Sequence, residues 1–354
     1  MIAGPNLNNA RLAWAVCICI LSASTSHASA PKPAAKFSNW PDIAYAGPTF
    51  DSFVRDSFRY VSAGNPARFY DSMEMGIESY FDEPWNSFIN RQRGLLAVAK
   101  SPEAKRDARV AVCTEVHRMV KQLVPKFSLD RGFEFAYMTT KGERQCFLQS
   151  ILIAGVLQRC EIESGIVMVY RNPAGQPSNL GHCVVVVTLS HGEQVLVDAS
   201  APEPFIAQKG IFARYRDDYI FLRPIFENKV FITGYRREVL PAASLPVQQV
   251  LPADITFMRS MFEYYRGERV INGVLTKNPS ESGIRKSIRQ LQKSVKLCRE
   301  NPLALYMLGL AIEKQGKSNQ WKYFYRKAKE LYSRSGWVPS NLDLALKRVK
   351  SDGS

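Results

Sequence analysis

The spacing of apolar positions is helical early in the chain, becomes strand-like in the middle, and turns helical again towards the end. A helix is predicted over 51–61, and a stronger one over 101–124, where Ser101 suits the cap position and apolar residues recur at helical spacing. Residues 146–157 are then apolar for about three turns. This run predicts a buried helix with Cys146 in its first turn.

Runs rich in β-branched residues predict the strands. The strand candidates are 165–170, 182–189, 193–198, 219–222 and 229–233. Residues 171–181 are rich in Asn, Pro and Gly and are predicted to form a loop that shapes specificity, and residues 190–192 (Ser-His-Gly) are predicted to be a turn.

From about Leu251 the pattern remains helical to the end of the chain. The predicted helices are 257–271, 284–300, 303–315, 319–335 and 341–350, separated by short gaps. The order of elements is therefore helices, a cysteine-bearing helix packed on an antiparallel sheet, and an all-helical tail. This order predicts an α+β domain followed by a helical one.

The first thirty residues match a secretory signal. Arg11 is followed by a short apolar run over 12–21 and by the small residues Ala28-Ser-Ala30, where a signal peptidase could cut. The run is shorter than the roughly 20 residues that a membrane-spanning helix needs. We therefore expect an exported protein, periplasmic or secreted, cleaved near Ala30.

The formal net charge of +15 is concentrated in the tail. Residues 257–354 contain twenty Lys or Arg and eight Asp or Glu, a balance of +12. Such a surface attracts anionic partners. For an exported protein we expect an anionic envelope polymer before nucleic acid, and a set of solvated basic helix faces is an equally good explanation.

Cys146 is the cysteine best placed for chemistry. Helix N-termini lower the pKa of a thiol and offer free N–H groups to an oxyanion. A thiolate also needs a base, and His182 is the best placed of four histidines because it begins a strand after a loop. Asp198, at the end of the returning strand, is the candidate to orient the imidazole. Each residue alone is more often a packing or turn residue, so the combination carries the prediction.

The length of one turn decides whether Asp198 can reach His182. With a three-residue loop over 190–192, Leu189 faces Glu193, and Asp198 lies diagonal to His182 on the same face, roughly 7–8 Å away at the backbone. Gly192 suits the left-handed position of such a loop. We predict this loop, because a two-residue loop would put Asp198 on the opposite face.

At these positions the sequence resembles the transglutaminase-like, papain-related superfamily over about residues 86–205. The matching segments are Gln145-Cys-Phe147, Val156-Leu-Gln-Arg-Cys160 with Ile162, and Gln194-Val-Leu-Val-Asp-Ala-Ser200. The resemblance implies a Cys146–His182–Asp198 triad. Gln145, Trp85 and Tyr137 are candidates for substrate or oxyanion binding. Cys183, directly after His182, departs from the aromatic residue common in the family.

The tail resembles one tetratricopeptide repeat. The matching positions are Tyr306, Leu308-Gly-Leu310, Gly316, Tyr325, Lys327-Ala328 and Leu331. The organisation that follows is a signal peptide (1–30), a linker with an N-terminal helical segment (31–85), a transglutaminase-like domain (86–245) and a tetratricopeptide-like helical domain (246–354).

The resemblance implies an enzyme that cleaves or transfers peptide or isopeptide acyl groups, most simply a protease or amidase, with a peptide or protein substrate. We expect no cofactor and no metal, and no nucleic-acid partner. The alternative is a non-catalytic scaffold whose basic helical tail binds a protein partner or an anionic envelope polymer. Pairing among Cys113, Cys160, Cys183 and Cys298 is left open.

Overall fold

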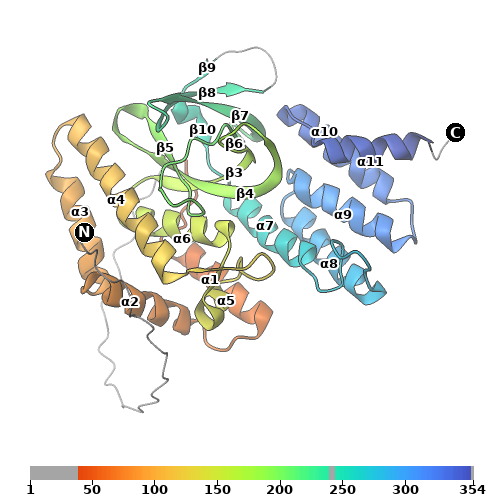
Figure 1. Ribbon diagram of the computed structural model, residues 1–354, viewed down its shortest axis with the longest axis horizontal. Coiled ribbons are helices and arrows are strands. Elements are labelled where there is room, and N and C mark those ends of the chain that lie inside the picture. Colours follow the sequence, from red (N-terminus) through yellow and green to blue (C-terminus); the bar gives the residue numbers. More distant parts are fainter. Residues whose placement is uncertain (1–38, 239–243, 352–354) are drawn as a thin grey trace, which may run out of the picture. The chain divides into compact units, whose positions relative to one another are not determined.

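The computed structural model describes residues 39–238 and 244–351 (Figure 1). The predicted signal sequence lies outside these residues. Within them, no helix is both long and apolar enough to cross a membrane. The fold is mixed α+β, with a six-stranded antiparallel β-barrel between an N-terminal group of helices and a C-terminal helical region.

Within the described residues, five helices precede the cysteine helix. They are α1 (Pro48–Val61), α2 (Ala67–Phe81), α3 (Trp85–Val98), α4 (Pro102–Leu123) and α5 (Phe135–Lys141). The Oγ atom of Ser101 accepts a hydrogen bond from the backbone N–H of Ala104, so α4 begins where the sequence predicts. Ile43, Ala44 and Tyr45, in the predicted linker, are buried, so this part of the linker packs into the core.

Helix α6 (Cys146–Arg159) lies at the centre of the described fold, and nearly all of its residues are buried. It is apolar on every side because α4 packs on it from one direction and strands β3 (Ser164–Arg171) and β4 (Pro177–Thr188) from another. β3 ends at Arg171 and β4 begins at Pro177, so the loop prediction for 171–181 is correct only for 172–176. His182 was predicted to begin a strand but lies inside β4.

The barrel closes through six strands. Four follow β3 and β4: β5 (Gln194–Val197), β6 (Gly210–Tyr215), β7 (Asp218–Glu227) and β8 (Phe231–Arg237). The order is β6-β3-β4-β5-β8-β7, and β6 pairs again with β7, so no strand of the six is left as an open edge. The sequence predicts five of these strands, but neither β6 nor the closure that it makes with β3 and β7.

Alternation along the strands separates two apolar clusters. One cluster fills the inside of the barrel and includes Val167, Val169, Val184, Val186, Leu196, Ile211 and Leu222. The alternate residues, such as Ile166, Met168 and Val185, face α6 and join the main core. Short elements complete this part of the fold: β1 (Lys126–Phe127), β2 (Glu143–Arg144), η1 (Ser190–Gly192), β9 (Ser244–Leu245), η2 (Val247–Gln249) and β10 (Val250–Leu251).

The C-terminal region consists of five helices, as predicted. They are α7 (Ile255–Glu268), α8 (Glu281–Leu297), α9 (Pro302–Gln315), α10 (Trp321–Ser335) and α11 (Ser340–Ser351), and each packs on the next. Asp254, Ser280 and Asn301 cap three of them with side-chain oxygens. Gly316 ends α9 in the left-handed conformation, with φ of 69°.

Arg266 connects α7 to the N-terminal helices. Its side chain is 2% exposed, and its Nε atom donates to Glu134 Oε1 at 2.6 Å. Its Nη1 atom donates to Asp56 at 2.8 Å and to Glu263 at 3.0 Å. A buried cation is stable only with such partners. Since Asp56 lies on α1 and Glu134 lies just before α5, these contacts join α7 to both.

Candidate active site

Cys146 is the first residue of α6 and is 7% exposed. Gln145, in the cap position, has extended backbone angles, and its side chain makes no capping hydrogen bond. The N–H groups of the first turn are therefore not satisfied by a capping side chain. The Sγ atom of Cys146 lies 3.8 Å from the carbonyl oxygen of Gly181, at the start of the histidine-bearing part of β4.

The hairpin that carries His182 and Asp198 has the predicted register. The N–H of Leu189 donates to the carbonyl of Glu193 at 2.7 Å, and Val185 pairs with Val197. Gly192 adopts φ of +73°, the left-handed conformation that such a loop requires. The prediction of a three-residue loop is confirmed, and Asp198 lies diagonal to His182.

His182 and Asp198 are in direct contact. The Nε2 atom of His182 lies 2.9 Å from Oδ2 of Asp198. This contact uses one ring nitrogen, and the other, Nδ1, is left to face the thiol of Cys146. The side chain of Asp198 is 5% exposed and that of His182 is 27% exposed, so the carboxylate is the more deeply buried of the two groups.

Asp198 is held by two further groups. The N–H of Ser200 donates to Oδ1 at 2.9 Å, and Nε2 of Gln208 donates to Oδ2 at 2.8 Å. Burial acts to raise the pKa of Asp198, but the hydrogen bonds from His182, Ser200 and Gln208 outweigh it, and the pKa is lowered. The sequence does not point to Gln208, because it lies outside the hairpin, just before β6, and only the fold brings it to the carboxylate.

The electrostatics favour a thiolate–imidazolium pair. The pKa of Cys146 is lowered well below the usual thiol value, first by a hydrogen bond with Cys183 and then, against the effect of burial, by His182. For His182, burial lowers the pKa, but Asp198 and the charge of Cys146 outweigh it and raise the pKa to about 10. At neutral pH both charged forms are therefore favoured.

Cys183 is a second thiol beside the nucleophile. It lies on the face of β4 that packs on α6, where its Sγ atom is 3.6 Å from Oγ of Ser150, one helical turn after Cys146. Burial and the neighbouring Cys146 charge raise the pKa of Cys183, so it keeps its proton, and a hydrogen bond with Cys183 in turn lowers the pKa of Cys146. From the sequence, Cys183 is a departure from the family pattern and a cysteine of open pairing, and its contact with the nucleophile is not predicted.

The three oxyanion candidates lie in different places. Gln145 adjoins the thiol, is 2% exposed, and its Oε1 has no hydrogen-bond partner among the described residues. The ring of Trp85 lies tilted against that of Tyr45, with centroids 4.5 Å apart, and stacks on Phe88 at 6.0 Å. Its described contacts are with other aromatic rings and none is with Cys146.

Tyr137, the third candidate, lies on α5. The guanidinium of Arg131 covers its ring at 5.6 Å, and the ring lines a separate cavity described below. Of the three candidates, only Gln145 is adjacent to Cys146.

The other cysteines of the described residues differ from Cys146. Cys113, Cys160, Cys183 and Cys298 are buried, and none forms a disulfide. Burial raises the pKa of Cys160 to about 12 and that of Cys298 to about 11. The described residues also contain no group of three or more His, Cys, Asp or Glu side chains arranged to hold a metal ion.

Comparisons with known proteins do not assign a family. No family model matches the sequence, and no curated protein matches it. Among solved structures, one similar chain is the subject of "Crystal structure of menin reveals the binding site for Mixed Lineage Leukemia (MLL) protein". The alignment has a TM-score of 0.37 and 12% sequence identity. It covers 85% of this chain and 64% of that chain. A likeness of this degree assigns neither fold family nor function.

Proposed function

We propose that this chain is an exported, transglutaminase-like cysteine enzyme with a tetratricopeptide-like tail. It cleaves or transfers peptide or isopeptide acyl groups through Cys146, His182 and Asp198, most simply as a protease or amidase. Export rests on the signal sequence, and the family on the segments around the three residues. The chemistry rests on the arrangement of the site.

The observation that carries the proposal is the 2.9 Å contact between His182 and Asp198 beside a thiol at a helix N-terminus. The carboxylate fixes which ring nitrogen remains for Cys146 and stabilises the imidazolium. The lowered pKa of Cys146 supports a nucleophile that is already a thiolate at neutral pH.

In the first step the thiolate of Cys146 attacks the carbonyl carbon of the acyl donor and forms a carbon–sulfur bond. The carbonyl oxygen becomes an oxyanion, to which the N–H groups at the start of α6 and the side-chain amide of Gln145 donate in this proposal. The carbon–nitrogen bond then breaks, and His182 gives its proton to the leaving amine. The product is a thioester on Cys146.

In the second step neutral His182 takes a proton from water, and the water oxygen attacks the thioester. The carbon–sulfur bond breaks, the acid leaves, and the thiolate–imidazolium pair is restored. An amine in place of water would give transfer rather than hydrolysis. We favour hydrolysis, as the resemblance implies for exported bacterial members of the superfamily.

Alkylation with iodoacetamide tests the pair directly. At neutral pH we expect one rapidly labelled residue among the described cysteines, Cys146, because burial raises the pKa of the other described thiols. In His182→Ala the labelling rate should fall about tenfold, because an unassisted thiol is only a few per cent thiolate at pH 7. Peptide mass spectrometry locates the label, and circular dichroism checks the fold.

Denatured protein serves as the control, because all cysteines should then react alike. Equal labelling rates for folded wild type and folded His182→Ala would rule out the ion pair and leave the scaffold alternative. The scaffold alternative is supported by Lys286 and Arg289 of α8, which have no ion-pair partner among the described residues.

A further inference from the structure

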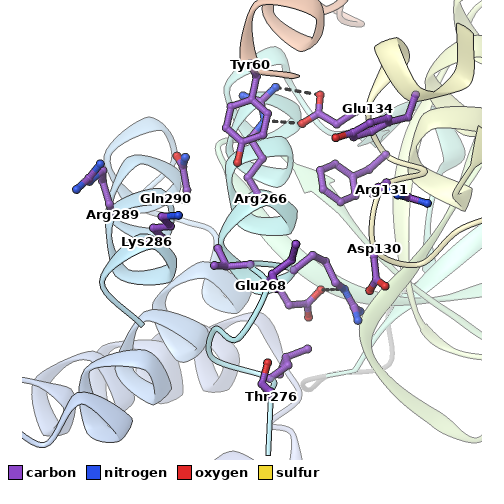
Figure 2. Close-up of a pocket in the computed structure, with 16 residues that line it drawn as sticks. Tyr60, Asp130, Arg131, Glu134, Arg266, Glu268, Thr276, Lys286, Arg289 and Gln290 are labelled. Carbon is purple, nitrogen blue, oxygen red and sulfur yellow. Dashed lines mark hydrogen bonds and ion pairs between the residues drawn. The ribbon is translucent and has the colours of Figure 1, made fainter. Parts of the chain in front are cut away.

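A cavity of about 970 Å³ lies between the N-terminal helices and the tail (Figure 2). The end of α1, the segment before α5, the end of α7 and one face of α8 line it. Figure 2 shows Lys286, Arg289 and Gln290 of α8 on one side and Asp130 and Arg131 on the other. Its volume is in the range of sites that hold small ligands or peptide side chains.

Most charges of the cavity are already paired. Arg266 is bound by Glu134, Arg269 by Glu268 at 2.9 Å, and Arg131 by Glu143 at 2.6 Å. Lys286 and Arg289 have no ion-pair partner among the described residues. The free positive charge of the cavity is therefore on α8.

These two cations begin a longer stripe. Lys286, Arg289, Lys293 and Lys296 recur at intervals of three and four residues, are exposed, and lack ion-pair partners within the described chain. Residues at this spacing share one face of a helix. The stripe is about 15 Å long, the length of roughly five residues of extended peptide.

The cavity also has an apolar side. Ile271 is 87% exposed and Leu275 is 47% exposed, and both line it together with Phe133 and the ring of Tyr60. Exposed aliphatic residues beside free cations suit a ligand that carries both negative charge and apolar side chains.

We infer that this cavity and the α8 stripe bind an acidic, partly apolar segment of a polypeptide. The stripe supplies charge complementarity along the segment, and the cavity takes its apolar side chains. A membrane surface is disfavoured because the apolar residues line a concave site. The inference does not depend on catalysis by Cys146, although Phe133 stacks on Tyr265 at 5.4 Å and Tyr265 packs on Phe147, the residue after Cys146, at 5.6 Å.

The test is a binding titration of the full chain carrying Cys146→Ala, which keeps the probe intact. The probe is a fluorescein-labelled peptide of about ten residues with alternating Glu and Leu, twice the length of the stripe. We expect Lys286→Glu/Arg289→Glu to weaken binding at least about tenfold, because two cation contacts become repulsive. The matched control Lys322→Glu/Arg326→Glu on α10 makes the same change in net charge and should alter binding less than about twofold.

Ile271→Ser separates the apolar part of the site from its charge. It should weaken binding of the Glu-Leu peptide more than that of a peptide of Glu and Ser. Equal losses in the α8 and α10 variants, no binding by the parent chain, or tighter binding of anionic vesicles or an oligonucleotide than of the peptide would each overturn the inference. None of these outcomes bears on the labelling of Cys146, so the two proposals can fail separately.

Discussion

Helix α6 has a buried cysteine at each end, and the two have opposite chemistry. Cys146 begins the helix and its pKa is lowered, whereas Cys160 caps the other end and burial raises its pKa to about 12. Both are less than a tenth exposed. Burial therefore does not decide the reactivity of a thiol in this fold. The difference comes from the groups around each sulfur, which are supplied to Cys146 by β4 and the segment after β5.

The C-terminal end of α6 is built for packing. Gln158 accepts a hydrogen bond from the N–H of Ile43 and donates to the carbonyls of Pro41 and Ser164. These bonds satisfy buried backbone groups and fix the segment before α1 to the helix. We therefore expect changes at this end to affect stability, and changes at the Cys146 end to affect reactivity.

The largest contrast should come from Asp198→Asn compared with Gln158→Leu. Loss of the carboxylate removes the orienting contact to His182, and acyl transfer should slow by about 10²–10⁴-fold. Gln158→Leu leaves buried backbone groups unsatisfied and should lower the free energy of unfolding by about 1–3 kcal/mol. Its labelling rate at Cys146 should stay close to that of wild type. A large loss of labelling in Gln158→Leu at a temperature where it is folded would contradict the division between the two ends.

The pH dependence should separate the two thiols next. Cys146 should label throughout the neutral range, and Cys160 should react only as the pH approaches about 12. The rate of acyl transfer should fall as the pH rises through about 10, because His182 then loses the proton that the leaving amine needs.

The same pKa shift is also linked to stability. Folding raises the pKa of His182 from 6.5 to about 10. Its contribution to the free energy of unfolding is therefore complete below pH 6.5 and is lost as the pH rises through about 10. The difference in melting temperature between wild type and His182→Ala should shrink over that range. A difference that grows with pH would be inconsistent with an imidazolium in the folded state.

The smallest effects should come from removing one neighbouring thiol at a time. Cys183→Ala removes a hydrogen bond to the thiolate, so the pKa of Cys146 should rise and labelling below neutral pH should slow by up to about tenfold. Cys160→Ala should leave the labelling rate of Cys146 unchanged and should lower the free energy of unfolding by about 1 kcal/mol, because it removes packing contacts. Identical labelling profiles for the two variants would mean that Cys183 does not support the thiolate.

The sequence predicts the parts of the site that depend on local geometry. The helix start at Cys146 follows from an apolar run and the hairpin register from the loop with Gly192, and both are found. Gln208 could not be predicted, because the turn that brings it to Asp198 is set by the return of the chain into β6. The apolar surroundings of α6 also gave no signal that Cys183 would contact the nucleophile.

Barrel closure shows the same limit at the level of the fold. Five of the six strand positions follow from runs rich in β-branched residues. β6 was not predicted, and its pairing with both β3 and β7 depends on contacts far apart in sequence. The tail was predicted helix by helix because its periodicity is local. The cavity beside α8 was not predicted, because its walls come from four separate segments.

The buried contacts of Arg266 also constrain how the sequence can change in evolution. Asp56, Glu134 and Glu263 come from three parts of the chain but share one cation that has almost no access to water. Loss of the cation would leave its carboxylates without a partner, and loss of Glu134 would leave the buried cation without its main partner. In homologous sequences these four positions should therefore covary, with Arg266 and Glu134 replaced together or retained together.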